Sequence, residues 1–242
     1  MDYQRFIDKL TDLYENWGEE SVRPKTEKFQ KALDRVQGMT TPNVMQLLNC
    51  AVSCMEAEEL YCEIGTYQGS SLIGALLDNG DRKAYAVDNF SELDEASDSL
   101  SNLLENLKKF NLENRVSFYN QDFEKFLLEL REVKLRPKIG TYFYDCAYDY
   151  RSQLMGLLLI RHCLSDRALI IVNNSNWKSV QQAQSDFVAA HPECEILQLS
   201  PSITAEPSFG NGIQLLSWDI ARREEFSADS ILANPMSVAK AM

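Results

Sequence analysis

The stretch LYCEIGTYQGSS, residues 60–71, sets the fold class of this chain. It opens with a short apolar run that predicts a buried strand, and it ends in a glycine-containing turn that leads into a helix. Since the helix must carry the chain back before the next strand can begin, this stretch indicates the first strand–helix unit of a parallel sheet.

The same alternation continues along the chain. The strand-like runs are LYCEIG, KAYAVD, RVSFYN, IGTYFYD, ALIIVN, CEILQL and GIQLLSW. Helical patterns separate the first six of these runs, over residues 70–77, 99–110, 123–130, 151–164 and 180–190. Repeated crossovers of this kind predict an α/β, Rossmann-like, doubly wound sheet of seven strands that is mostly parallel. The loop SPSITAEPSFGN between the last two runs is too irregular for a crossover helix, so we expect an antiparallel last strand.

Helical patterns also precede the sheet, over residues 6–17, 29–36 and 41–55. We therefore expect an N-terminal helical cap (1–58), an α/β domain (59–220) and a C-terminal tail (221–242) that is either a docked helix or a loose end. The amphipathic face of the first helix is compatible with a homodimer.

Composition and charge narrow the classes of function. The 242 residues carry a formal net charge of −12, whereas a nucleic-acid surface needs clustered Lys and Arg, so we expect no nucleic-acid partner. No signal peptide is visible and no apolar run approaches the ~20 residues of a membrane span, so we expect a cytoplasmic protein with no membrane partner. The six cysteines form no CxxC pair, which favours reduced, mostly buried thiols over a zinc site.

In an open α/β sheet the ligand lies at the carboxyl ends of the strands, so the residues after each strand are the candidates for a site. A dinucleotide-binding loop has the form GxGxxG, in which the second glycine makes room for a diphosphate. Here Tyr67 occupies that position, and Glu63 precedes the first glycine. Bulk and negative charge at these places argue against a diphosphate ligand.

The string EIGTYQGSS resembles motif I of the class I S-adenosylmethionine-dependent methyltransferases, in the form found in small-molecule O-methyltransferases similar to catechol and caffeoyl-CoA methyltransferases. The resemblance covers roughly residues 39–218 and includes the antiparallel last strand. It implies that residues 59–220 bind S-adenosylmethionine. It also implies that the chain methylates a hydroxyl group of a small, neutral or aromatic acceptor.

The resemblance assigns a set of residues to the cofactor: Glu63, Gly65, Tyr67, Gly69, Ser71, Asp88, Asp122 and Asp145. Gly65 and Gly69 let the backbone approach the cofactor, while Glu63 and Ser71 hold its amino-acid end. Asp88 ends the second strand, where an acid bridges the two ribose hydroxyls.

Two further roles follow from the same resemblance. Tyr67 packs near the sulfonium, and Asp122 contacts the adenine edge. Structural alternatives remain for single residues: Glu63 as a paired acid, Asp88 as a helix cap and Tyr67 as a core aromatic.

The segments YDCAYDY (144–150) and VNNSNW (172–177) resemble the metal-binding segments of the metal-dependent O-methyltransferases. The resemblance places Asp145, Asn173 and Asn174 at the three ligand positions for Mg²⁺ or a similar cation. Asn173 stands where that family has Asp, so the metal site is degenerate. One carboxylate and two amides weaken the binding of Mg²⁺, which prefers anionic oxygen, rather than exclude it.

Two mechanisms remain open. In the first, a weakly held cation with Asp145 and Asn174 lowers the pKa of an acceptor hydroxyl. In the second, which we favour, no metal takes part, Asp145 or Asp149 is the general base, and Tyr148 shapes the pocket.

The acceptor wall is expected from residues 39–41, 148–151, Trp177 and Phe209. This wall would be largely aromatic with few cations, Arg151 being the one nearby basic residue. His162 and His191 are interpreted as structural. An alternative function is a non-catalytic protein that keeps the methyltransferase fold and serves as a binding or assembly subunit. Loss of the second metal-binding acid and the lack of a histidine base favour that alternative.

Overall fold

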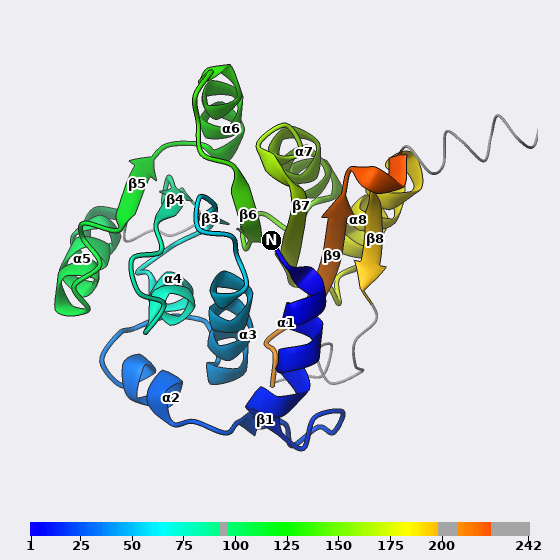
Figure 1. Cartoon of the computed structure of the whole chain (residues 1–242). Helices are drawn as coiled ribbons and strands as arrows, with labels where there is room; N and C mark the ends of the chain where they lie inside the picture. The colour runs from blue at the N-terminus through cyan, green and yellow to red at the C-terminus, as the bar shows by residue number, and fades with distance from the viewer. Residues whose placement is uncertain (92–95, 198–207, 224–242) are drawn as a thin grey trace, which may run out of the picture.

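The computed structural model describes residues 1–91, 96–197 and 208–223 (Figure 1). Its centre is a seven-stranded sheet with the order β5-β4-β3-β6-β7-β9-β8. The strands are β3 (Leu60–Ile64), β4 (Ala84–Asp88), β5 (Val116–Asn120), β6 (Ile139–Tyr144), β7 (Leu164–Asn173), β8 (Cys194–Leu197) and β9 (Ile213–Asp219). The predicted Rossmann-like sheet of seven strands is confirmed.

Strand pairing also agrees with the sequence. The pairs from β5 through β7 are parallel, and β9 runs antiparallel between β7 and β8. The order of the strands reverses between β3 and β6, because β4 and β5 extend the sheet to one side and β7 extends it to the other. In sheets of this kind the ligand crevice lies at that reversal, beyond the carboxyl ends of the strands.

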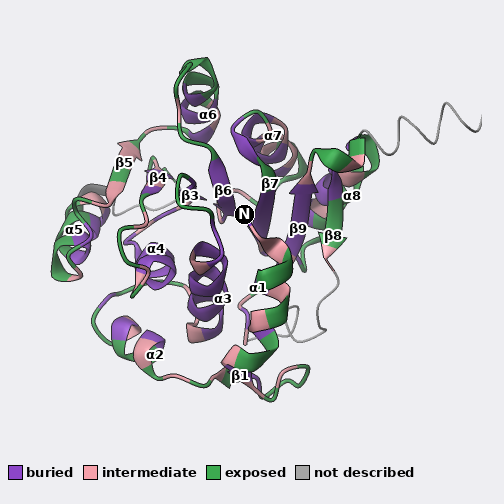
Figure 2. Cartoon of the chain, viewed as in Figure 1, coloured by how far each residue is buried: buried purple, intermediate pink, exposed green. Residues whose placement is uncertain are grey.

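Helices cover both faces of the sheet. They are α1 (Tyr3–Leu10), η1 (Thr11–Leu13, a 3-10 turn), α2 (Lys28–Leu33), α3 (Pro42–Ser53), α4 (Ser70–Leu76), α5 (Ala96–Lys109), α6 (Phe123–Glu132), α7 (Tyr150–Ile160) and α8 (Lys178–Ala190). Alternate residues of β7 point to opposite faces. Leu169 and Ile171 pack with α1, α3, α4 and α5, whereas Ile170 and Val172 pack with α6, α7 and α8. Both faces of the central strands are therefore buried (Figure 2).

The amino-terminal segment differs from the single helix predicted over residues 6–17. After α1 and η1 the chain forms β1 (Tyr14–Glu15), which pairs antiparallel with β2 (Arg23–Pro24). Asn16 adopts a left-handed conformation with φ 56°, which a right-handed helix cannot contain. Tyr14 therefore leaves the helix and packs into the core, where its hydroxyl donates to the Asn43 carbonyl over 2.7 Å.

Residues 1–58 share one hydrophobic core with the sheet, through side chains such as Phe6 and Leu48. The boundaries at residues 58 and 220 stay a prediction. Most of the predicted tail and most of the loop before β9 lie outside the described residues. All six cysteines are thiols, and five of them are buried. Among the described helices, none is long and apolar enough to cross a membrane.

Candidate functional site

Most of the predicted site residues meet around one cavity of about 390 Å³, at the carboxyl ends of β3, β4, β6 and β7. The predicted residues that line it are Gly65, Tyr67, Ser71, Asp88, Asp145, Tyr148, Asn173 and Asn174. Residues from distant parts of the sequence therefore converge where the strand order reverses.

The loop after β3 passes so close to β6 that its first residue must be glycine. Gly65 has φ +88°, and a Cβ atom there would lie 2.0 Å from the carbonyl oxygen of Asp145. Gly69, with φ +86°, directly precedes α4, and a Cβ atom there would lie 2.7 Å from Leu103 Cδ1. Between them, Tyr67 is also left-handed, at φ 47°. These three residues hold the loop backbone against the cavity.

Asp88, at the end of β4, is fixed by backbone amides on both of its oxygens. Oδ2 accepts from the Tyr67 N–H over 2.7 Å, and Oδ1 accepts from the Phe90 N–H over 2.7 Å. A carboxylate has about four lone-pair positions, so each oxygen retains acceptor capacity toward the cavity. Asp88 is therefore not a helix cap, and its orientation is set before any ligand arrives.

Glu63 is fully buried behind the loop and reaches the cavity only through Ser71. The Tyr61 hydroxyl donates to Glu63 Oε2 over 2.5 Å, and the Ser71 hydroxyl donates to Oε1 over 2.8 Å. Burial raises the pKa of Glu63 to about 8, against the lowering effect of these two hydrogen bonds. Negative charge on Asp145 and Asp88 raises the pKa further. Glu63 is thus a carboxyl group that is largely protonated at neutral pH.

Amide side chains surround the Asp145 carboxylate at the end of β6. Asn173 Nδ2 donates to Asp145 Oδ1 over 2.7 Å, and Asn174 Nδ2 lies 3.3 Å from the same oxygen. Asn174 Oδ1 in turn accepts from Asn211 Nδ2 over 2.9 Å. Two amides thus converge on one carboxylate oxygen of Asp145, and the third, Asn211, bonds to one of these two.

The residues around Asp145 do not fit a magnesium ion. Asn173 and Asn174 turn their nitrogens, not their oxygens, toward the carboxylate. The Asn173 oxygen is buried without a hydrogen-bond partner and faces away from that contact, while the Asn174 oxygen is used by Asn211. Mg²⁺ needs converging oxygens, which here would require both amides to turn over. Within the described part of the chain, no group of three or more His, Cys, Asp or Glu is placed to hold a metal.

Tyr148 lines the cavity, whereas Trp177 is not among the lining residues and contacts Tyr148 by ring stacking. Tyr148 and Trp177 stack with ring centroids 5.5 Å apart and planes inclined by 28°, and their side chains are 40% and 50% exposed. Met39, which is 77% exposed, lines the same cavity together with Thr40. The described lining contains two carboxylates, Asp88 and Asp145, and no Lys, Arg or His.

Two predicted acids do not reach the cavity lining. Asp149 is exposed and caps α7, since Oδ1 accepts from the Ser152 N–H over 3.0 Å, and its hydrogen bonds to Ser152 lower its pKa. Asp122 is exposed and caps α6, where it accepts from the Glu124 and Lys125 amides. Both aspartates serve the start of a helix. Of the two predicted general bases, only Asp145 lines the cavity.

Some lining residues were not predicted from the sequence. Gly210 and Asn211 come from the loop before β9, and Asn89, Phe90 and Cys146 follow strands β4 and β6. The available signal was the GNG triplet at residues 210–212, which marks a turn.

Both histidines lie outside the cavity lining, as expected for structural residues. His191 is buried, stacks on Phe187 with centroids 4.2 Å apart, and contacts the Phe187 carbonyl and Arg161. His162 lies beside Arg161, and partial burial together with nearby arginines lowers its pKa.

Comparison with known proteins agrees with this geometry. Residues 62–175 match a family described as a methyltransferase domain. The chain is similar to the O-methyltransferase from Bacillus cereus solved in complex with SAH, at 16% identity and a TM-score of 0.59, over 81% of this chain and 92% of that one. It is also similar to the O-methyltransferase TomG from Streptomyces achromogenes solved with SAM, at 13% identity and a TM-score of 0.57, over 90% and 99%.

A third similar structure is the SAH-bound methyltransferase PaMTH1 from Podospora anserina, at 16% identity and a TM-score of 0.57, over 80% of this chain and 86% of that one. No curated protein matches the sequence. Residues 62–175 therefore match a methyltransferase domain, and the chain has the Rossmann-like fold of these solved methyltransferases.

Proposed function

We propose that this chain transfers a methyl group from S-adenosylmethionine to a hydroxyl group of a small, uncharged acceptor that is aromatic. The observation that carries the proposal is the placement of Asp88 and Asp145 around one cavity, at the ends of the two strands that flank β3, beside the loop at Gly65. Asp88 is oriented to accept from ribose hydroxyls, and Ser71 with Glu63 is placed to hold an amino group.

Electrostatics support this cofactor. S-adenosylmethionine carries a sulfonium and an ammonium, both cationic, and the cavity lining offers the carboxylates Asp88 and Asp145 with no described cation. Opposite charges in a partly enclosed cavity attract more strongly than in water. Tyr67 lines the same cavity, so its ring is available to the sulfonium.

The charge and the aromatic character of the cavity lining also favour a particular kind of acceptor. Phosphorylated acceptors are disfavoured because two carboxylates repel them and no Lys, Arg or His lines the described cavity. Tyr148, stacked on Trp177, gives the cavity one aromatic surface, which suits a flat ring. The same negative lining supports the expectation that nucleic acid is not a partner.

Asp145 is the residue that we assign to proton transfer. S-adenosylmethionine supplies an electrophilic methyl group when it is bound. The bound cofactor would give its methyl group to the acceptor oxygen and keep the electron pair on sulfur, while Asp145 would take the hydroxyl proton. Asn173 and Asn174 hold that carboxylate in place, and positioning of the acceptor in line supplies most of the rate.

A binding titration with S-adenosylhomocysteine (SAH), the reaction product, tests the cofactor site without knowledge of the acceptor. We expect binding that is the same with magnesium and with EDTA. Turnover is then sought with single phenols and with catechols as acceptors, and SAH formation is measured. Because the amides leave no converging oxygens for a metal that would chelate two hydroxyls, single phenols should serve as well as catechols.

The alternative, a non-catalytic binding or assembly subunit, has a distinct outcome in the same experiments. It is supported by the withdrawal of Asp149 to a helix cap, which leaves one candidate base at the cavity. SAH binding without turnover on any phenol would favour this alternative, and absence of SAH binding would contradict the cofactor site itself. A homodimer and a cytoplasmic location remain predictions.

A further inference from the structure

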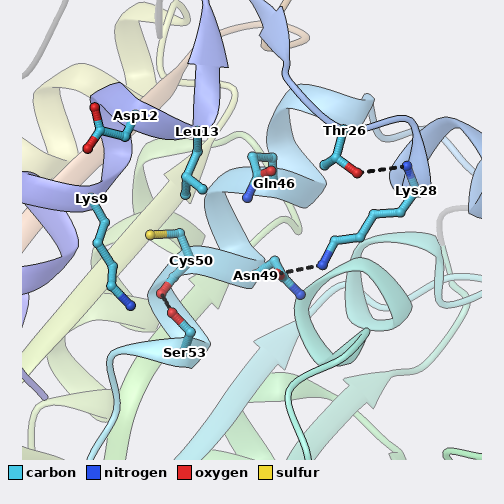
Figure 3. Close-up of a pocket in the computed structure, with 9 residues that line it drawn as sticks. All are labelled: Lys9, Asp12, Leu13, Thr26, Lys28, Gln46, Asn49, Cys50 and Ser53. Carbon is cyan, nitrogen blue, oxygen red and sulfur yellow. Dashed lines mark hydrogen bonds between the residues drawn. The ribbon is translucent and has the colours of Figure 1, made fainter.

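A second cavity, of about 370 Å³, lies between α1, the start of α2 and one face of α3 (Figure 3). Its floor comes from positions 46, 49, 50 and 53 of α3, whose spacing of three and four residues places them on one side of the helix. None of its lining residues lines the cavity around Asp145. It is therefore a separate feature of the fold.

Gln46 is the unusual residue of this cavity. The residue is 4% exposed, and none of the described hydrogen bonds engages its amide, which opens onto the cavity rather than being sealed in the core. Figure 3 shows the amide directed into the space that the lining residues enclose. An amide at the surface of a cavity can bond either to water or to a polar group of a ligand. Gln46 therefore offers a ligand in this cavity both a donor and an acceptor.

Asn49, the neighbouring buried amide, shows the contrast. Its nitrogen donates to the carbonyl oxygens of Gly74 and Leu77 over 2.9 Å and 2.7 Å, at the end of α4. Its oxygen accepts from Lys28 Nζ over 3.3 Å. Asn49 therefore has a structural role within the chain, whereas Gln46 has none that the described contacts reveal.

Lysine side chains reach the cavity from opposite walls. Lys9 comes from the last turn of α1 and Lys28 from the first residue of α2 (Figure 3). No described acid lies within ion-pair distance of Lys9, including Asp12 at the rim. Lys28 pairs with Asp78 over 3.2 Å, but the Asp78 side chain is 71% exposed and its charge is screened by solvent. Two ammonium groups at one cavity contrast with the net charge of −12.

We propose that this cavity binds a small organic anion whose carboxylate or phosphate lies between Lys9 and Lys28 and whose adjacent polar group hydrogen-bonds to Gln46. Ammonium groups are the natural partners of such oxyanions, and the amide of Gln46 both donates and accepts. Leu13 and Cys50 give the ligand an apolar surface to pack against. The proposal does not depend on the methyltransferase reaction.

The test titrates the full chain separately with citrate and with inorganic phosphate at low salt. Isothermal calorimetry measures affinity, and the side-chain amide signal of Gln46 in a proton–nitrogen NMR spectrum reports the location. We expect saturable binding of at least one anion with a shift of that signal. Citrate alone would identify carboxylate ligands, and phosphate alone would identify phosphorylated ones.

Variants separate this site from general charge effects. The double variant Lys9→Met, Lys28→Met keeps the apolar stems and should weaken binding by at least about tenfold, as expected when two charge-assisted contacts are lost. The control Lys83→Met, Lys134→Met makes the same change in net charge at exposed lysines elsewhere and should leave binding unchanged. Gln46→Leu keeps both lysines and should also weaken binding. Equal losses in both double variants, or no saturable binding of either anion, would overturn the proposal.

Discussion

The amide nitrogen of Asn173 lies 2.7 Å from Oδ1 of Asp145 and donates a hydrogen bond to it. Asn173 ends β7 and Asp145 follows β6, so two paired parallel strands carry both side chains to the same edge of the sheet. The neutral amide of Asn173 thus lies beside the Asp145 carboxylate. A second carboxylate at this position would repel Asp145 unless a cation lay between them. Together with the contacts of Asn174, this hydrogen bond leaves few oxygens directed toward a magnesium ion.

Replacement of Asn173 by aspartate should therefore make the stability of the protein depend on a bound metal ion. Asn173→Asp removes a hydrogen bond to a charged group, a loss of about 1.5–3 kcal/mol, and places two carboxylates side by side. We expect a lower unfolding temperature in EDTA and its recovery in millimolar magnesium. Thermal unfolding of wild type and variant, each with and without magnesium, measures both effects.

Asn89→Asp is the matched control, since Asn89 lines the same cavity and is exposed. It adds the same charge without removing the contact to Asp145, and should show no magnesium response. Stabilisation of the wild type by magnesium, or a variant that ignores the metal, would contradict the account based on amides.

The Asp88 carboxylate leads to a prediction about affinity. Asp88→Ala removes a charged acceptor already oriented by the Tyr67 and Phe90 amides. SAH binding should weaken by roughly 1.5–3 kcal/mol, as is typical for hydrogen bonds to a charged group. Calorimetry gives the value, and Asp122→Ala, which alters a helix cap away from the cavity lining, is the control. An unchanged affinity for SAH in Asp88→Ala would remove Asp88 from the cofactor site.

Sequence patterns predicted the sheet because burial on two faces leaves short, unbroken apolar runs such as ALIIV, and these runs alternate regularly with helical patterns. The hairpin of β1 and β2 escaped prediction, since Tyr14 continues the helical spacing from Phe6 while Asn16 breaks the helix. The left-handed conformation of Asn16 thus ended the helix although the apolar spacing continued.

The candidate site was predictable where a side chain ends a strand, as Asp88 does, or directly follows one, as Asp145 does. It was less predictable where an aspartate begins a helix, because Asp122 and Asp149 also follow strand and turn residues, and the sequence does not distinguish a cap from a ligand. Asn211 contacts Asn174 across 37 residues of sequence, and no local pattern indicates such a contact.

Gly65 should tolerate no side chain. Gly65→Ala would place Cβ 2.0 Å from the Asp145 carbonyl oxygen, in backbone with φ +88°. We expect a loss of several kcal/mol or a chain that does not fold, because neither backbone segment has room to move. Gly80→Ala is the control, since φ is +53° there but nothing lies within 4 Å, and it should cost about 1 kcal/mol. Urea unfolding compares the two, and equal losses would refute the close approach of the loop to β6.

Burial of Glu63 should make stability depend on pH. Its pKa rises from 4.5 to about 8 on folding, so between these values the native state binds more protons than the unfolded state. Stability contributed by the protonated form is therefore lost as pH rises, by up to ~1.4 kcal/mol per pH unit. Glu63→Gln should flatten this slope in urea unfolding across the window, while the exposed control Glu58→Gln should not. An unaltered slope in Glu63→Gln would mean that Glu63 titrates as an exposed acid.

The same carboxyl group should couple cofactor binding to proton release. In the free protein at pH 7, Glu63 is mostly protonated, since its pKa is about 8. The Ser71 hydroxyl lies 2.8 Å from Glu63 Oε1. An ammonium group held at Ser71 would favour the ionised form of Glu63, so SAH binding should expel up to about one proton. Calorimetry in buffers with different heats of ionisation counts that proton, and the count should fall to near zero in Glu63→Gln. Tight SAH binding with no proton released by the wild type would show that Glu63 stays neutral and that the ammonium lies elsewhere, because a carboxyl group in contact with a buried cation cannot keep its proton at this pH.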